Sequence, residues 1–165
     1  MATVTTSGTA KLTLPSDTQI NITREFAAPK HLVYEAITTP ELVKRWWNAK
    51  RGEVTTCEID LREGGKWRYV METPDGFEVA FHGEFREIVP NERLVSTEAY
   101  EGVPNPDDNA TVNTVTLAEE AGRTTMNVLV QCPSAEVRNA IIESGMEAGM
   151  QDAYDLLEEV AVSLA

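Results

Sequence analysis

The sequence predicts an α+β protein in which an antiparallel sheet packs against one long C-terminal helix. Between residues 57 and 132, short segments alternate apolar and polar residues and are separated by turn residues, a pattern typical of consecutive hairpins. Apolar residues at helical spacing occur in two short stretches within residues 28–47 and in one long stretch from residue 134 onward. Two short helices are therefore expected between the first two strands, and a long helix after the last one.

The clearest hairpin lies in the stretch from Cys57 to Glu72. Cys57–Leu61 and Lys66–Glu72 both alternate apolar and polar residues, and Gly64 and Gly65 between them provide the backbone freedom that a tight turn needs. The apolar face of the second strand carries the large side chains of Trp67, Tyr69 and Met71. Such a face either packs against a helix or lines a cavity.

The N-terminal part divides into a short leading segment and the start of a single domain. Residues 1–17 are rich in Thr, Ser and Ala and are expected to form either a tail or an added edge strand. Alternating apolar residues from Thr18 predict the first strand of a domain that spans residues 18–165. Arg24 lies on the apolar face of this strand and is the odd member of that face.

Two prolines mark the short helices. Proline is well tolerated at the first position of a helix, and the apolar stripe after Pro29 predicts a helix that ends before Pro40. A second helix is predicted from Glu41 to Trp47. Trp46 and Trp47 lie about 100° apart around a helix, so one of them is expected in the core and the other near the mouth of a pocket.

The last helix is predicted to begin at Ser134, a residue well suited to cap a helix N-terminus. Its apolar stripe comprises Ile142, Met146, Gly149, Ala153, Leu157, Val160 and Leu164, while the residues expected to face away are Glu143, Glu147, Gln151, Asp155 and Glu158. Glycine inside a helix costs about 1 kcal/mol relative to alanine. Gly149 therefore indicates either a close approach of helix and sheet or open volume. We favour open volume, because the facing strands carry the large residues Trp67, Tyr69 and Met126.

Composition argues against several classes of function. The formal net charge of −13 disfavours nucleic-acid and anionic-membrane partners, because both attract clustered Lys and Arg. No stretch approaches the roughly 18 apolar residues of a membrane span, and the N-terminus lacks the features of a signal peptide. We therefore expect a cytoplasmic protein. Cys57 and Cys132 are expected to be buried, reduced thiols.

Motifs for metal, cofactor or nucleophilic chemistry are absent from the sequence. His31 and His82 are the two histidines, and neither has an acidic residue at metal-ligand spacing on a shared helix. The glycine patterns of nucleotide binding and the serine motif of hydrolases do not occur. We expect no metal, no cofactor and no catalytic residue that belongs to a recognisable motif.

The order of the predicted elements resembles the helix-grip fold of the START and birch-pollen-allergen-like (SRPBCC) superfamily, in which a curved antiparallel sheet wraps around a long C-terminal helix. Motifs across residues 20–164 are similar to those of the activator of heat-shock-protein-90 ATPase homologue-like family. They are Phe26-x-Ala28-Pro29, Val33-Tyr34-x-Ala36, Thr39-Pro40-Glu41, Trp46-Trp47, the segment from Glu58 to Trp67, Gly83-Glu84-Phe85 and Val89-Pro90-x-Glu92-Arg93-Leu94. The resemblance implies a binder of small molecules or lipids with a cavity between the sheet and the long helix. The chaperone role belongs to eukaryotic members that carry an additional domain.

Enzymes of this superfamily, polyketide cyclases among them, aim a polar side chain into an apolar cavity. Arg24 is the best candidate for this position. It either anchors a carboxylate or enolate oxygen of a ligand or forms a structural salt bridge with a neighbouring acidic residue. Glu84 and Glu98 could act as general bases only if they pointed inward, and strand alternation places Glu84 outward.

We predict a protein that binds a hydrophobic or amphipathic small molecule, lipid-like or polyketide-like, in a cavity covered by the C-terminal helix. The alternatives are a polyketide cyclase- or aromatase-like enzyme and a chaperone-regulating interaction protein. We expect a monomer or a homodimer, because an antiparallel sheet leaves edge strands that the N-terminal segment can cover or extend. The predicted ligand-binding residues are Arg24, Trp46, Trp67, Tyr69, Met71, Phe81, Met126, Met146, Gly149 and Met150.

Overall fold

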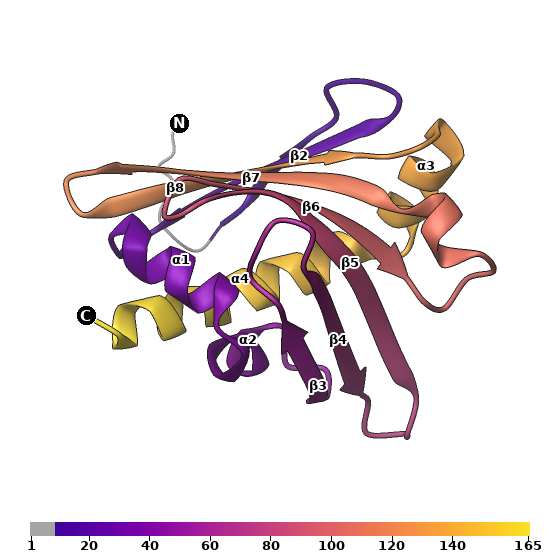
Figure 1. Cartoon of the computed structure of the whole chain (residues 1–165), viewed down its shortest axis with the longest axis horizontal. Helices are drawn as coiled ribbons and strands as arrows, with labels where there is room; N and C mark the ends of the chain where they lie inside the picture. The colour runs from indigo at the N-terminus through magenta and orange to yellow at the C-terminus, as the bar shows by residue number, and fades with distance from the viewer. Residues whose placement is uncertain (1–8) are drawn as a thin grey trace.

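A computed structural model describes residues 9–165 as a curved antiparallel sheet with helices against its concave face (Figure 1). The strands are β1 (Lys11–Thr13), β2 (Gln19–Phe26), β3 (Glu53–Ile59), β4 (Lys66–Glu72), β5 (Glu78–Val89), β6 (Arg93–Tyr100), β7 (Thr111–Glu120) and β8 (Arg123–Gln131). The helices are α1 (Lys30–Thr38), α2 (Pro40–Trp46), α3 (Ala135–Glu143), α4 (Met146–Ser163) and the short 3-10 helix η1 (Pro106–Asn109). The predicted α+β helix-grip fold is confirmed.

The first long strand lies beside the last one in the sheet. β2 pairs with β8 so that Ile22 is opposite Val128 and Arg24 is opposite Met126. The strands from β3 to β8 follow one another in chain order, as the predicted hairpins require. Residues paired across antiparallel strands share one face of the sheet, so the register shows which side chains face α4.

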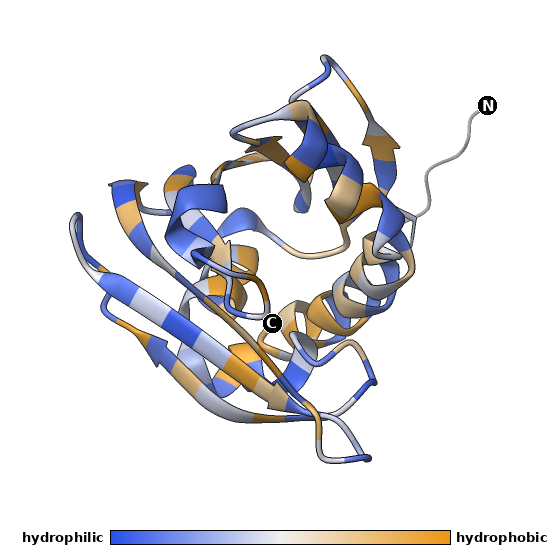
Figure 2. Ribbon diagram, turned by 90° about the vertical axis from the view of Figure 1, so that its right-hand side faces the viewer, coloured by the Kyte–Doolittle hydropathy of each residue, from blue (hydrophilic) through white to orange (hydrophobic). Residues whose placement is uncertain are grey.

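The helices cover the concave face of the sheet. α4 crosses this face, and α1 and α2 lie beside it, where α2 contacts both α4 and β3 (Figure 1). Apolar and polar residues alternate along α4 (Figure 2), and those that are buried are Ala153, Leu157, Val160 and Ala161. Pro29 immediately precedes α1 and Pro40 begins α2, as the sequence predicted.

An N-terminal strand covers the free edge of β2. β1 pairs with β2, with Leu12 opposite Ile22. Just before it, Ala10 is fixed to α4, because its N–H donates to Gln151 Oε1 (2.9 Å) and its carbonyl accepts from Gln151 Nε2 (2.8 Å). The expectation for the rest of the leading segment falls on residues 1–8, which lie outside the described residues.

Arg24 connects the sheet to α4 through buried ion pairs. Its side chain is fully buried, with Nη2 at 2.9 Å from Asp155 Oδ1 and Nη1 at 3.4 Å from Glu158 Oε1. Nη1 also donates to the carbonyl of Glu25 at 2.6 Å. The prediction that Asp155 and Glu158 face away from the sheet was wrong. Both residues flank the apolar stripe, close enough for the long Arg24 side chain to reach their carboxylates.

The predicted C-terminal helix is divided into two parts. Ser134 caps α3 as predicted, since its Oγ accepts the Val137 N–H at 3.2 Å. α3 ends at Glu143 and is followed by Ser144, Gly145 adopts a left-handed φ of 83°, and α4 then begins at Met146. Glycine favours this conformation, which commonly ends a helix. The prediction of an uninterrupted helix from Ser134 onward therefore failed at Gly145, and α4 is the long helix of the fold.

The two glycines of this region should respond oppositely to alanine. Gly145→Ala places a side chain at a left-handed φ and should lower the free energy of unfolding by roughly 1–2 kcal/mol. Gly149→Ala introduces a better helix former inside α4, where no atom lies within 4 Å of the new Cβ. This change should raise the free energy of unfolding by up to about 1 kcal/mol. Urea unfolding of both variants tests this. Equal effects at the two positions would contradict the assignment of Gly145 to a helix break.

The Arg24 ion pairs should contribute measurably to stability. Arg24→Met leaves Glu158, whose side chain is only 18 % exposed, without its cation, and we expect a loss of about 1–3 kcal/mol in urea unfolding. Asp155 is 42 % exposed and can be rehydrated, which limits the loss. Arg123→Met is the matched control, because Arg123 forms a more exposed ion pair with Glu25 at 2.7 Å and should lose less than about 1 kcal/mol. A loss at Arg24 no larger than at Arg123 refutes this role.

Candidate functional site

The concave face of the sheet is filled along β2 and β8. The inward side chains of these strands are almost completely buried against α1 and α4. They are Ile20, Ile22, Arg24, Phe26, Thr124, Met126, Val128 and Val130. This half of the interior is a closely packed core that leaves no accessible surface for a ligand.

The other half of the concave face is not filled in the same way. Several inward positions of β4 to β7 and of the first half of α4 are only half-buried, although others on the same strands, such as Trp67 and Met71, are buried. A Cβ built on Gly149 meets no atom within 4 Å, so open space adjoins α4 here. We name a set of half-buried residues in this half the inner site: Trp47, Tyr69, Phe81, Glu98, Asn113, Met146, Gly149, Met150 and Tyr154. Of these, Met146, Met150 and Tyr154 also pack against the core of the filled half.

A row of aromatic rings forms one wall of the inner site. Trp47, just after α2, packs edge-on against Tyr69 of β4 and Phe81 of β5, with ring centroids 5.4 and 5.8 Å apart. The row continues from Tyr69 to Trp67 at 4.7 Å and from Phe81 to Tyr100 at 5.1 Å. Edge-to-face contacts of this kind hold the rings in fixed orientations, so the wall is ordered before any ligand arrives.

Trp67 crosses the neighbouring strand to reach the one after it. Its Nε1 donates to the carbonyl of Thr97 at 3.2 Å, which satisfies the indole N–H in a buried position. The path runs over Gly83, where any Cβ would lie 2.6 Å from Trp67 Nε1 and 1.9 Å from the Thr97 oxygen. Glycine is therefore required at this point of β5.

A carboxyl group lies on the inner face of β6. Glu98 is paired with Thr111, whose strand neighbour Asn113 donates from Nδ2 to Glu98 Oε1 at 3.1 Å. Thr111 Oγ1 in turn donates to Asn113 Oδ1 at 2.9 Å and so orients the amide. Desolvation raises the pKa of Glu98, and the Asn113 hydrogen bond opposes this only in part.

Two phenols lie near the Glu98 carboxyl. Burial raises the pKa of Tyr69 on β4 and of Tyr154 on α4, and the negative charge of Glu98 adds to the increase at both. Both phenols therefore stay protonated and can donate hydrogen bonds. Cys57 on β3 is paired with Tyr69, and burial raises its pKa to about 11, so the thiol is not an activated nucleophile.

The predicted binding residues separate into three groups. Those that lie in the inner site are Tyr69, Phe81, Met146, Gly149 and Met150. Arg24, Trp46 and Met126 belong to the filled half instead, where Trp46 Nε1 donates to the Ala36 carbonyl at 2.9 Å. Trp67 and Met71 are buried on the inward face of β4. Of the two predicted roles for Arg24, the ion pairs with Asp155 and Glu158 are those of a structural salt bridge.

Several inner-site residues were not among the predicted binding residues, namely Trp47, Glu98, Asn113 and Tyr154. Strand parity contained the signal for Glu98, because it shares its face with the buried Leu94. Tyr154 lies four residues after Met150, which places it on the same helical face. Of the two adjacent tryptophans, Trp46 was the predicted binding residue, but it packs against the core, whereas Trp47 contacts Tyr69 and Phe81.

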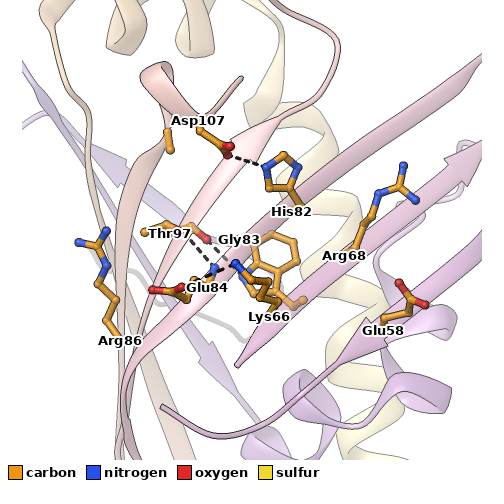
Figure 3. A pocket seen from close by; sticks show the side chains of 11 residues that line it. Glu58, Lys66, Arg68, His82, Gly83, Glu84, Arg86, Thr97 and Asp107 are labelled. Atoms are coloured by element: carbon orange, nitrogen blue, oxygen red, sulfur yellow. Dashed lines mark hydrogen bonds and ion pairs between the residues drawn. The ribbon is translucent and has the colours of Figure 1, made fainter. Parts of the chain in front are cut away.

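The main surface hollow lies on the opposite face of the sheet (Figure 3). It has a volume of about 580 Å³ and is lined largely by charged, outward side chains of β4 and β5, with Asp107 of η1 at its rim. A second hollow of about 360 Å³ adjoins Lys11 and Glu25. Neither hollow lies between the sheet and α4.

His82 holds the loop after β6 against this outer face. Its Nε2 lies 2.6 Å from Asp107 Oδ1 and its Nδ1 lies 2.8 Å from Glu101 Oε2 (Figure 3). Arg68 forms two further bonds to the same Glu101 carboxylate, both 2.9 Å long. The hydrogen bond to Asp107, and then that to Glu101, raise the pKa of His82. Arg68 lowers the pKa of Glu101 to about 2.

Residues 9–165 contain no candidate metal site, because no group of three or more His, Cys, Asp or Glu side chains among them has an arrangement that could hold a metal ion. None of the helices described is both long enough and apolar enough to cross a membrane.

The curved antiparallel sheet, the long helix across its concave face and the partly open interior define a helix-grip protein of the α+β class. Within this class, the chain belongs to the family described as Activator of Hsp90 ATPase homolog 1-like protein, whose sequence profile matches residues 27–161. The resemblance drawn from the sequence motifs is thereby confirmed. No curated protein matches the chain.

Solved bacterial structures share the whole fold. A protein from Rhodobacter sphaeroides is 27 % identical, with a TM-score of 0.85 over 95 % of this chain and 100 % of its own. A Mycobacterium smegmatis protein is 25 % identical, with a TM-score of 0.80 over 90 % and 94 %. A Nitrosomonas europaea protein is 27 % identical, with a TM-score of 0.78 over 89 % and 96 %. These are described by their source, without a ligand or a reaction.

The His82 contacts predict a titration that NMR can follow. Because its folded pKa is raised above 6.5, His82 should stabilise the fold fully below pH 6.5, and this contribution should be lost as the pH rises through the folded pKa. The imidazole resonances should therefore titrate above pH 6.5. Asp107→Asn removes the stronger partner and should move the midpoint down. A midpoint at or below 6.5 that is unchanged in Asp107→Asn would refute the contact.

Proposed function

We propose that this protein binds a hydrophobic or amphipathic small molecule, lipid-like or polyketide-like, in the inner site. The observation that carries the proposal is the open space beside Gly149 on α4, in a protein whose β4 and β5 carry an ordered aromatic wall. Trp47, Tyr69 and Phe81 of this wall are only half-buried, and the proposal has their remaining ring surface meet the ligand. Ligand sites are typically apolar hollows of this kind, with a few polar groups that fix the orientation of the ligand.

The residues around the space suit an apolar ligand of variable shape. Met146 and Met150 on α4 have unbranched, polarisable side chains that adapt to different partners. Apolar surface of the ligand and of the site that is removed from water contributes about 25 cal/mol per Å² of favourable free energy. Glu98 and Asn113 provide a polar end on β6 and β7, so the ligand is expected to carry a polar group at one end.

An enzyme of the cyclase or aromatase type is the second candidate. Its support is the inward position of Glu98, whose raised pKa suits a general acid or base. A chaperone-regulating role has less support, because the large exposed apolar residues are distributed over separate loops and ends of elements. Examples are Leu14, Leu61, Phe77, Val103 and Val162. As a binding protein it is expected to be a monomer or a homodimer.

Filling the space beside α4 should abolish binding. Gly149→Leu extends a side chain into a region with no atom within 4 Å of the Cβ, so stability should be equal or higher while uptake of the fluorescent probe N-phenyl-1-naphthylamine is lost. Ala148→Leu is the matched control, because Ala148 is exposed on the same helix, and it should bind the probe as the wild type does. Native mass spectrometry of freshly purified protein should show a retained small molecule.

Two results would oppose this placement of the site. One is a marked drop in melting temperature of Gly149→Leu, which would mean that the space is filled by packing. The other is probe fluorescence that Gly149→Leu and Ala148→Leu reduce to the same extent.

A further inference from the structure

We propose that the inner site selects apolar molecules that carry a basic nitrogen, with the Glu98 carboxylate as counter-ion and the aromatic row as the surrounding surface. This inference rests on the proposed function and names the ligand class of the same site. It follows from the charges that face the interior, from the hydrogen bonds that Glu98 makes and lacks, and from the rings on the same face of the sheet.

The inner face holds almost no positive charge. Among the inward strand positions of residues 9–165, which the pairing registers identify, Arg24 is the one basic side chain. Both of its terminal nitrogens are already engaged by the carboxylates of Asp155 and Glu158 and by backbone carbonyls. A ligand with a carboxylate would therefore meet no available cation in the interior, and it would face Glu98.

The Glu98 carboxylate accepts a hydrogen bond from one donor among the described side chains. Asn113 Nδ2 donates to Oε1, while Thr111 is occupied with Asn113 Oδ1. The titratable groups on which the charge of Glu98 acts are Tyr69 on β4 and Tyr154 on α4, and next to these lie Cys57 on β3 and the paired Arg24 on β2. None of these carries a free positive charge. A desolvated carboxylate gains most from a cation, so an ammonium group is the partner that this position lacks.

Aromatic faces complete the recognition of a cation. Tyr100 lies two residues after Glu98 on the same face of β6, and its ring stacks on Phe81 at 5.1 Å. Phe81 leads on to Trp47 and Tyr69. Cations bind favourably over such ring faces, more so where water is excluded. The overall charge of −13 also raises the local concentration of cationic ligands.

Three naphthalene derivatives of nearly the same shape test the charge preference. They are 2-naphthylmethylamine, 2-naphthylmethanol and 2-naphthoate, which are cationic, neutral and anionic at pH 7. Isothermal titration calorimetry of the wild-type protein should show the amine binding about tenfold or more tightly than the alcohol, since a charge-assisted hydrogen bond is of that order. The acid should bind most weakly.

The source of the preference is tested with two isosteric variants. Glu98→Gln keeps the size of the side chain and an oxygen for Asn113, and should make the amine and the alcohol bind alike. Glu84→Gln removes the same charge from the outward face of β5, where Glu84 lies 3.8 Å from Lys66, and should retain the full preference. Circular dichroism melts of both variants confirm that the fold is intact.

The outcomes separate this inference from the proposed function. If the acid binds as tightly as the amine, or if the preference survives in Glu98→Gln, the amine proposal is overturned while the inner site remains a binding site. If the alcohol binds in the wild type and not in Gly149→Leu, the proposed function holds whatever the charge result. If none of the three compounds binds, both proposals are wrong.

Discussion

The buried guanidinium of Arg24 is the contact on which the interior of this protein depends. It joins the middle of β2 to the second half of α4 through Asp155 and Glu158, and so fixes where the helix lies on the sheet. A salt bridge buried in this way contributes less to net stability than to a unique arrangement, because desolvation offsets much of the Coulomb attraction. The helix is thus held firmly at one half of the concave face, and the apolar side chains of β2 and β8 fill that half.

The arrangement of residues in the other half of the concave face is related to the same constraint. α4 begins only at Met146, after the left-handed Gly145 that follows α3, and it packs against α1 and α2. Gly149 contributes no side chain there, and the rings of Tyr69 and Phe81 pack against Trp47. The result is a molecule with one packed half and one accessible half.

Most of the fold could be predicted from the sequence because strand alternation and helical spacing are local signals. The order of elements, the two prolines at the short helices and the Ser134 cap all depend on residues close together in the chain. The position of the helix break could not be predicted, because Gly145 also fits a continuous stripe at helical spacing. The site was predicted less well, because it depends on contacts between distant parts of the chain. Strand alternation shows that a side chain such as Arg24 faces inward, but it does not show that Asp155 of α4 will pair with that side chain.

The contrast between Arg24 and Glu98 shows how such a fold can acquire a ligand preference without a change in the arrangement of its sheet and helices. Both are charged residues on the inner face, yet the terminal nitrogens of Arg24 are paired with two carboxylates of α4, whereas Glu98 has one donor among the described residues, the neutral Asn113 amide. On the outer face, His82, Glu101 and Arg68 neutralise one another and hold a loop. Charges that are paired within the protein serve its structure, and a charge left facing an accessible apolar space is free to select a ligand. Changes at a few inward polar positions can therefore redirect binding while the sheet and α4 stay as they are, consistent with relatives of about 25–27 % identity that keep the same fold.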